Sequence, residues 1–264
     1  MRTFVVSDIH GQYNAYIKML EKIKFGKKDF LYVLGDCIDR GPDGINVIKD
    51  LMKRENAELI LGNHELMLLN SLEYLRDIEA GREPSNMTDD GMSPLELWTH
   101  PCNGGEGTSM EYSGLPEAEK ASIEKFLRSR RLIKRITIGD KKYHLSHSYS
   151  LNKAFGKEVF LSKCTPEMAE SIVWETLFDK TKDRTVPEKL FGYQRDIYVM
   201  GHIFTQRFGE MTEDGKGKIY KGDNYRGYTV IDVDCGMALN GRSSRLGCIC
   251  LETGEEYYVP LLDD

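Results

Sequence analysis

The sequence lacks a long apolar run, since nowhere do about 18 apolar residues follow one another, the length that a membrane-spanning helix needs. It also lacks a basic excess, because 36 Lys and Arg stand against 42 Asp and Glu and give a net charge of −6. Proteins that bind a nucleic acid polymer irrespective of its sequence use a broad basic surface. We therefore expect neither a membrane nor a nucleic acid polymer as partner, while small phosphates and phosphoproteins stay open.

Paired cysteines are lacking as well. The six cysteines, at positions 37, 102, 164, 235, 248 and 250, show no spacing that suggests a disulfide framework. We expect free thiols in a reducing compartment. The sequence begins directly with a strand pattern rather than a targeting segment, so the expected location is cytoplasmic. With no internal repeat and no low-complexity tract, residues 1–264 fit a single domain.

What the sequence does contain is three short polar blocks, each directly after a strand-like apolar run. The blocks are Ser7-Asp8-Ile9-His10-Gly11, Gly35-Asp36-Cys37-Ile38-Asp39-Arg40-Gly41 and Gly62-Asn63-His64-Glu65. Apolar residues at helical spacing follow each block, so strand, polar loop and helix alternate. Such alternation predicts a parallel sheet, and parallel sheets bind ligands beyond the carboxyl ends of their strands.

Four of the six histidines belong to this pattern. His10, His64, His147 and His202 each lie just past a predicted strand end, whereas the other two histidines do not. Aspartate and histidine suit first-row divalent cations, and two such cations ~3.5–4 Å apart can share one carboxylate and one hydroxide. The gathering of these donors therefore predicts a two-metal site.

The rest of the chain is less regular. Residues 79–112 are rich in Gly, Pro, Asn, Asp and Thr, which predicts an irregular excursion over the site. A helix near 116–130 and a hairpin from 132–138 and 141–146 follow, and residues 149–196 are expected to form a cap, helical around 165–179. Strands predicted at 197–200, 218–220, 228–233, 246–251 and 256–259 indicate a mostly antiparallel second half. The expected fold is α/β, with two mixed sheets packed as a sandwich flanked by helices.

Taken together, the three blocks resemble the phosphoprotein phosphatase family of the calcineurin-like metallophosphoesterases. The family motifs run Gly-Asp-x-His-Gly, Gly-Asp-x-x-Asp-Arg-Gly and Gly-Asn-His-Glu in this order, and Ser7 in place of the first glycine is the only departure. Leu145-Ser146-His147-Ser148 and Met200-Gly201-His202 look like the fourth and fifth family blocks. The resemblance spans roughly Thr3 to Val259 and implies the calcineurin-like sandwich fold.

The resemblance also implies a role for each residue of the site. Asp8 and His10 would bind one cation, Asn63, His147 and His202 the other, and Asp36 would bridge the two. We expect Mn²⁺, with Fe, Zn or Mg as alternatives, because geometry and availability decide among them. Arg40 would hold the substrate phosphate with its planar fork, alongside Asn63 and His64. His64 would also be the general acid, with Asp39 orienting its ring and raising its pKa.

Some segments depart from the family pattern. Thr176 stands where the family has a second phosphate-binding arginine, and Arg184 or Arg195 could take over that role. Asn103-Gly104-Gly105 with Thr108 resembles another family block, which either edges the substrate or forms a plain turn. Trp174 is interpreted as core packing.

A last block, Ile231-Asp232-Val233-Asp234-Cys235-Gly236, resembles the family sequence Ile-Asp-Thr-Gly. The charge of Asp234 is an insertion relative to that sequence. We interpret Asp232 as a structural residue rather than a metal ligand.

These features favour a dinuclear-metal phosphoesterase that hydrolyses phosphate monoesters by attack of a metal-bridging hydroxide, most simply a serine/threonine protein phosphatase. Its substrate would be a phosphorylated protein or a small phosphoester. The first alternative is a bis(5′-nucleosyl)-tetraphosphatase on the same site. The excursion disfavours it, because Glu79, Asp89 and Asp90 are acidic and Arg82 is the only Lys or Arg there.

A second alternative, from another class, is a non-catalytic phospho-binding scaffold that keeps the sheet and not the reaction. Such a chain should have lost at least one residue of the reaction centre. Asp36, Asn63, His64 and Arg40 are all retained, which disfavours the scaffold.

Overall fold

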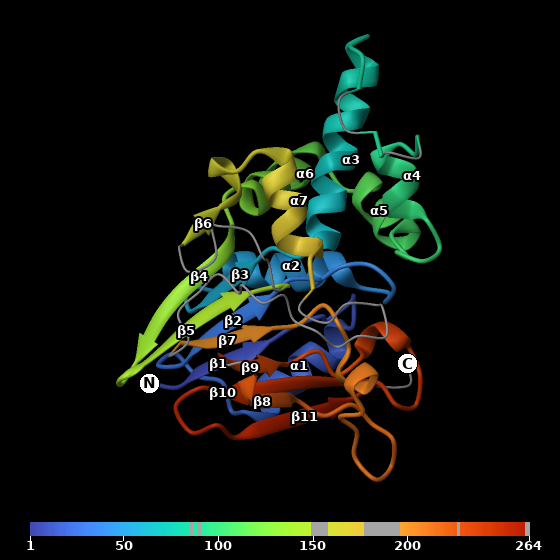
Figure 1. Ribbon diagram of the computed structural model, residues 1–264. Coiled ribbons are helices and arrows are strands. Elements are labelled where there is room, and N and C mark those ends of the chain that lie inside the picture. Colours follow the sequence, from blue (N-terminus) through green and yellow to red (C-terminus); the bar gives the residue numbers. More distant parts are fainter. Residues whose placement is uncertain (85–86, 89–90, 149–157, 177–195, 226–227, 262–264) are drawn as a thin grey trace.

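The computed structural model describes residues 1–84, 87–88, 91–148, 158–176, 196–225 and 228–261 (Figure 1). The strands in this part of the chain are β1 (Thr3–Val6), β2 (Phe30–Leu34), β3 (Ala57–Ile60), β4 (Arg131–Ile138), β5 (Lys141–Ser146), β6 (Val159–Phe160), β7 (Ile197–Met200), β8 (Tyr220–Tyr225), β9 (Tyr228–Asp232), β10 (Arg245–Cys250) and β11 (Glu256–Pro260). They form one sheet in the order β11-β10-β1-β2-β3-β4-β5-β7-β9-β8, with β6 beside β4.

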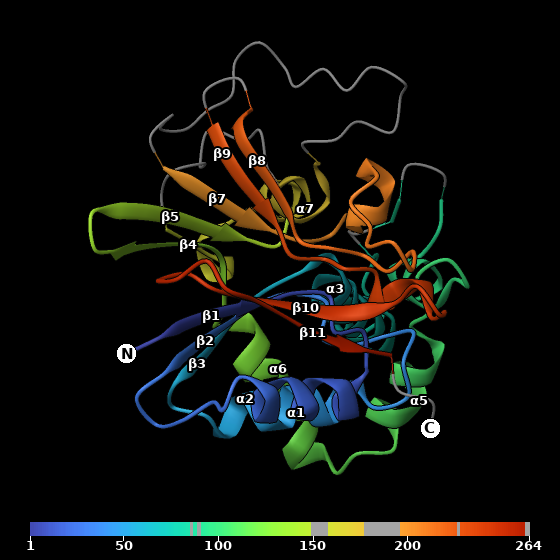
Figure 2. The same ribbon diagram turned by 90° about the horizontal axis from the view of Figure 1, so that it is seen from below.

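The sheet curls so that its two halves face each other (Figure 2). Val5, Tyr32 and Leu34 of one half share a buried apolar cluster with Leu145 and Val199 of the other. The predicted sandwich of two packed layers is therefore confirmed. The layers are nevertheless joined, because Ile60 of β3 pairs with Arg131 of β4 and makes the two predicted sheets one continuous sheet.

The helices are α1 (Tyr13–Lys22), α2 (Gly44–Lys53), α3 (Asn63–Glu79), α4 (Pro94–Thr99), α5 (Glu106–Ser113), α6 (Glu117–Arg128) and α7 (Pro166–Trp174), with short 3-10 helices η1 (Leu161–Lys163), η2 (Thr205–Phe208) and η3 (Met237–Leu239). Successive strand residues point to opposite faces. Val5 therefore faces the inside of the curl, while Phe4 and Val6 belong to the larger core with Met19 of α1 and Ile48 of α2. Figure 2 shows α1 and α2 covering that outer face.

The predicted alternation of the first sixty residues is confirmed, since β1, β2 and β3 are parallel and each is followed by a helix. Helix α6 and the β4–β5 hairpin are also where the sequence predicts them. No helix in the described ranges has the length and apolar character needed to cross a membrane. All six cysteines are free thiols, as expected.

The prediction of an irregular excursion over 79–112 is wrong at residues 94–99 and 106–112, which are helical, and holds for the other described residues after Glu79. Helices α4 and α5 lie there, α4 packed against α3 and α5 against α4 and α2 (Figure 1). Ser93 caps α4 by accepting a hydrogen bond from the Glu96 N–H (3.2 Å), and Pro94 is the first helical residue. Serine and proline at these positions start a helix, so the turn-like composition reflects helix ends rather than missing structure.

The mostly antiparallel second half is confirmed, because β4–β5, β4–β6, β8–β9, β10–β11 and β1–β10 pair antiparallel, while β5, β7 and β9 pair in parallel. Two further predictions need correction. The strand predicted at 218–220 is β8, which begins at Tyr220. The helix expected around 165–179 is α7, which ends earlier, at Trp174. Most of the predicted cap, residues 149–157 and 177–195, lies outside the described residues.

Candidate metal centre

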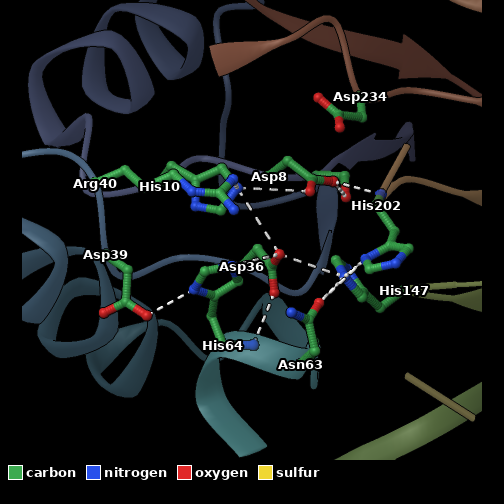
Figure 3. A network of polar contacts seen from close by, with 12 residues as sticks. Asp8, His10, Asp36, Asp39, Arg40, Asn63, His64, His147, His202 and Asp234 are labelled. Atoms are coloured by element: carbon green, nitrogen blue, oxygen red, sulfur yellow. Dashed lines mark hydrogen bonds and ion pairs between the residues drawn. The ribbon is translucent and has the colours of Figure 1, made fainter. Parts of the chain in front are cut away.

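Five strand ends deliver polar side chains to one place (Figure 3). Asp8 and His10 follow β1, Asp36 follows β2, Asn63 and His64 begin α3 after β3, His147 follows β5, and His202 follows β7. The strands come from both halves of the curled sheet. Apart from His202, which is half-buried, all these side chains are buried. The structure thus brings together every residue that the sequence nominates as a metal ligand.

Asp36 lies at the middle of this group. Its Oδ2 is 3.4 Å from Nε2 of His147, 3.7 Å from Nε2 of His64 and 3.8 Å from Nε2 of His10. Two sets of side chains could each hold a metal ion, namely His10 with Asp36 and His64, and Asp36 with His147 and His202. Asp36 is the member that both sets share.

The remaining donors complete the two sets. Oδ1 of Asn63 lies 2.9 Å from Nε2 of His147 and 3.1 Å from Nδ1 of His202. Asp8 lies on the other side, with Oδ1 3.8 Å from Nε2 of His10 and Oδ2 accepting a hydrogen bond from the His202 N–H (3.0 Å). Oδ1 of Asn63, Nε2 of His147 and Nδ1 of His202, each of which can donate a lone pair, thus meet beside Asp36.

Backbone carbonyls orient two of the imidazoles. Nδ1 of His147 is 2.7 Å from the Leu34 carbonyl oxygen, and Nδ1 of His10 is 3.2 Å from the Ile38 carbonyl oxygen. A carbonyl can only accept, so each Nδ1 carries the proton and each Nε2 presents its lone pair to the centre. This tautomer is the one that a metal-binding histidine needs.

Burial dominates the electrostatics of the centre. It raises the pKa of Asp8 and of Asp36 well above the usual range, and the charges of Asp234 on Asp8 and of Asp8 on Asp36 add to the effect. It lowers the pKa of His10 and of His147 well below the usual range. Crowded buried carboxylates beside neutral imidazoles are stabilised by a cation, so the donor set fits divalent metal ions.

The backbone at the centre adopts left-handed conformations that non-glycine residues rarely take. Positive φ values occur at Asp8 (51°), His10 (47°), Asp36 (52°), Asp39 (68°), Arg40 (67°) and His202 (73°). Only two other non-glycine residues, Lys24 and Asn240, share this conformation in the described part of the chain. Such strain concentrates at functional sites, because the surrounding structure must hold it there.

His64 and Asp39 form the hydrogen-bonded pair that the resemblance implies. Nδ1 of His64 lies 2.6 Å from Oδ2 of Asp39, which turns Nε2 of His64 towards Asp36. The expectation that Asp39 raises the pKa of His64 is wrong. Burial lowers that pKa well below its usual range, and the positive charge of Arg40 adds to the effect. The same burial raises the pKa of Asp39 to about 7.

Arg40 stands at the edge of the centre. Its Nη1 donates to Nε2 of His10 (3.0 Å), and its backbone N–H donates to the Gly104 carbonyl oxygen (3.1 Å). The Asn103-Gly104-Gly105 block therefore lies directly against Arg40. Gly104, Arg40 and His202 line one cavity of about 790 Å³, whose wall also includes Phe204, Arg207 and Asp234.

Sequence reasoning gave no role to several residues that hold this centre. Glu65, which is fully buried, accepts hydrogen bonds from the backbone N–H groups of Asp36 (3.0 Å), Cys37 (2.7 Å) and Gly62 (3.0 Å). Its place as the last letter of the Gly-Asn-His-Glu block is the signal that could have revealed it. Trp98 donates from Nε1 to Asp39 (2.9 Å) and has no such signal, because it lies in the range predicted to be irregular.

Asp234 is the other residue that the sequence undervalues. It is buried, it lines the cavity, and it lies close to Asp8 and His202 in Figure 3. Burial raises its pKa to about 6. Asp232 is also fully buried, and its Oδ1 accepts the Asp234 N–H (2.9 Å), an arrangement that matches the interpretation of Asp232 as structural.

Trp174 and Thr176, from the segment that departs from the family pattern, both belong to the described residues. Trp174 packs against the main core, as interpreted, and its ring also meets His202 edge-on at 5.9 Å. Thr176 follows α7. Arg184 and Arg195, the two arginines proposed to replace it, lie outside the described residues.

A curled mixed sheet that gathers aspartates and histidines at its strand ends defines a class of metal-dependent hydrolases of phosphoric esters. Residues 1–206 match the profile of the calcineurin-like phosphoesterases, and the chain belongs to this family. The family uses two divalent metal ions, and the Asp and His groups described here can hold them. The family membership and the retained donors decide against a non-catalytic scaffold.

Curated relatives match part of the chain. The symmetrical bis(5′-nucleosyl)-tetraphosphatase of Buchnera aphidicola subsp. Acyrthosiphon pisum (strain Tuc7) is 42% identical over 71 residues, which is 26% of this chain and 26% of that protein. The enzyme of the same name from Cellvibrio japonicus (strain Ueda107) is 44% identical over 71 residues, again 26% of each chain. The match thus spans about a quarter of the relatives' length.

Solved structures share the fold across the whole chain. A putative diadenosine tetraphosphatase has a TM-score of 0.56 at 19% identity and covers 100% of this chain and 95% of its own. A protein serine/threonine phosphatase from Saccharomyces cerevisiae has a TM-score of 0.57 at 14% identity, with 100% and 80% covered. At these identities the likeness establishes the fold alone.

Proposed function

We propose that the chain hydrolyses dinucleoside tetraphosphates, cleaving them symmetrically into two nucleoside diphosphates. The observation that carries this proposal is the local identity with symmetrical bis(5′-nucleosyl)-tetraphosphatases, 42% over 71 residues. The cavity of about 790 Å³ beside the centre supports it, because a chain of four phosphates needs room beyond the phosphate that reacts.

Six residues would hold the cations in this proposal. Asp8 and His10 would bind one cation, Asn63, His147 and His202 would bind the other, and Asp36 would be shared by both. The spacing around Asp36 supports that role, since three imidazole nitrogens lie 3.4 to 3.8 Å from its Oδ2. Two divalent cations, for which we propose Mn²⁺, supply an activated water and neutralise phosphate charge.

The chain's own side chains would position the phosphate and move the proton. Arg40 grips two phosphate oxygens with its planar guanidinium, and Asn63 and His64 contact the same phosphate. Burial lowers the pKa of His64 and raises that of Asp39 to about 7. A protonated Asp39 would therefore donate to Nδ1 and leave the single proton of the neutral ring on Nε2, from which His64 would give it to the leaving oxygen. Asp39 keeps the ring in this orientation through the 2.6 Å contact with Nδ1. Trp98 in turn holds Asp39 through a 2.9 Å hydrogen bond.

The sequence alone favours a phosphoprotein substrate, and the acidic excursion over 79–112 mildly supports it because it would suit a basic peptide. Glu79 is the last residue of α3, and Asp89 and Asp90 lie outside the described residues. The cavity wall beside the centre instead carries two arginines, Arg40 and Arg207, together with two acidic residues, Glu106 and Asp234.

A side-by-side assay tests the proposal. Phosphate release from a phosphoserine or phosphothreonine peptide and nucleotide release from diadenosine tetraphosphate would be measured with Mn²⁺ on one preparation. We expect faster turnover of the dinucleotide, with ADP as the product. Faster turnover of the peptide would leave the metal centre as proposed and overturn the substrate.

A further inference from the structure

Arg207 lines the cavity beside the metal centre. It belongs to none of the family blocks and is not one of the candidate metal ligands. It lies on η2, just after His202, and its guanidinium carbon is 4.7 Å from the centre of the Phe204 ring. The side chain is exposed and forms no ion pair with any residue that the structure describes. Stacking on an aromatic ring fixes the plane of a guanidinium and leaves its N–H edge to bind an anion.

The segment that carries Arg207 is fixed to the metal centre. The Thr205 N–H donates to the Asp234 carbonyl oxygen (2.9 Å), and Nε2 of Gln206 donates to the Cys235 carbonyl oxygen (3.0 Å). These bonds tie η2 to the loop that also holds Asp234 beside Asp8. Arg207 therefore projects from a positioned element rather than from a free loop.

Arg207 and Arg40 reach the same cavity from different parts of the fold. Arg40 follows β2, whereas Arg207 follows β7 of the other half of the sheet, and both line the cavity of about 790 Å³. A phosphate held by Arg40 is the one that reacts at the metals. A monoester has no further phosphate for Arg207, whereas a polyphosphate extends a row of negative charges into the cavity.

We propose that Arg207 is a specificity-determining residue that binds a phosphate of the leaving group, beyond the bond that breaks. This inference rests on the proposed dinucleoside tetraphosphate hydrolysis and deepens it. Arg207 favours polyphosphates over simple monoesters, because only a polyphosphate can occupy both Arg40 and Arg207. The cavity wall also carries the acidic residues Asp234 and Glu106. Arg40 and Arg207 are the arginines of the wall to which phosphates can bind.

Steady-state kinetics of Arg207→Ala with two substrates test this inference in the Mn²⁺-loaded enzyme. One charge-assisted contact is worth about tenfold in affinity, so the ratio of kcat/KM for diadenosine tetraphosphate to that for para-nitrophenyl phosphate should fall about tenfold. We expect the loss in the KM for the tetraphosphate, with little change in its kcat. Arg207→Lys should recover part of the KM.

Arg130→Ala is the matched control. Arg130, two residues past the end of α6, lies over the ring of Phe126 on that helix at 4.3 Å, so this variant removes a similar arginine–phenylalanine pair that does not line the cavity. It should leave the substrate ratio unchanged. An unchanged ratio in Arg207→Ala, or an equal loss on both substrates, would overturn the subsite while the proposed function stands.

Inhibition by inorganic tripolyphosphate separates the two hypotheses. If the wild-type enzyme turns over the aryl phosphate and not the tetraphosphate, the proposed function fails. The subsite is then judged by tripolyphosphate inhibition of aryl phosphate hydrolysis. An inhibition constant about tenfold weaker in Arg207→Ala supports the subsite, and an equal constant in both enzymes rejects it.

Discussion

Asp36 is the residue on which the metal centre depends most, because both candidate ligand sets include its carboxylate. Asp36→Asn keeps the shape and removes the charge, so we expect the variant to lose one or both cations. Metal content per chain after dialysis against Mn²⁺ measures this. Asp77→Asn, which changes a carboxylate in an exposed ion pair with Arg82, is the control. An unchanged metal stoichiometry in Asp36→Asn would refute the bridging role.

The proton donor is the second residue-scale question. His64→Asn removes the Nε2 proton that we assign to the leaving oxygen. A general acid contributes about 10²- to 10⁴-fold in rate, and mainly to substrates whose leaving group is poor. We expect a loss of that size with an alkyl phosphate and a much smaller loss with an activated aryl phosphate, read from kcat/KM. Equal losses on both substrates would remove His64 from this role.

Individual residues differ in how far the sequence reveals them. The site roles of Asp36, His64 and Arg40 can be predicted from the sequence. Each residue lies a fixed number of positions past a strand end, and the fold brings these positions to the centre. The role of Trp98 cannot be predicted from the sequence, because its hydrogen bond to Asp39 joins residues 59 positions apart. The pKa of His64 could not be predicted either, since it depends on how completely the packed chain excludes water.

At the scale of elements, the end of β7 packs against the end of β1 with no room for a side chain. A Cβ at Gly201 would overlap Oγ of Ser7 and Oδ2 of Asp8. Gly201→Ala should therefore separate His202 from Asp8, lowering both the unfolding free energy and the catalytic rate. Overpacking of this kind costs about 1–3 kcal/mol, which urea unfolding of the metal-free protein can measure.

Gly114→Ala is the control for that substitution. A Cβ at Gly114 would make only ordinary contacts, 3.6 Å from the Glu111 carbonyl oxygen and 3.7 Å from that of Met110. It should leave stability and rate near the wild-type values. If Gly201→Ala behaved in the same way, the two strand ends would not be packed as tightly as described.

Elements are predictable where their pattern is local. The alternating strands and helices of the first sixty residues follow from periodicity, and so does the β4–β5 hairpin. Helices α4 and α5 escape prediction because they are short, and their ends are rich in the residues that also make loops. The parallel pairing of β5, β7 and β9 is a long-range property, so no local pattern shows it.

For the whole molecule, the centre joins the two halves of the curled sheet, because Asp36 comes from one half and His147 from the other. Cations bound there should stabilise the entire fold. At a concentration of 100 times Kd the gain is about 2.7 kcal/mol. For a chain of this size that gain raises the melting midpoint by roughly 5–10 °C.

Thermal unfolding with and without Mn²⁺, followed by chelation, measures this effect. The rise should be reversed by the chelator and should be much smaller in Asp36→Asn. If Mn²⁺ raised the melting midpoint of Asp36→Asn as much as that of the wild-type protein, Mn²⁺ would stabilise the protein by binding at another place.

The place of β1 in the sheet has a consequence for synthesis of the chain on the ribosome. Strand β1 lies between β2 and β10, where Phe4 pairs with Cys250 and the Thr3 N–H donates to Glu252 (2.7 Å). One edge of β1 therefore has no partner until β10, more than 200 residues later in the sequence, has been translated. Contacts so distant in sequence close slowly. The nascent chain can pair this edge of β1 only after the segment with β10 has left the exit tunnel.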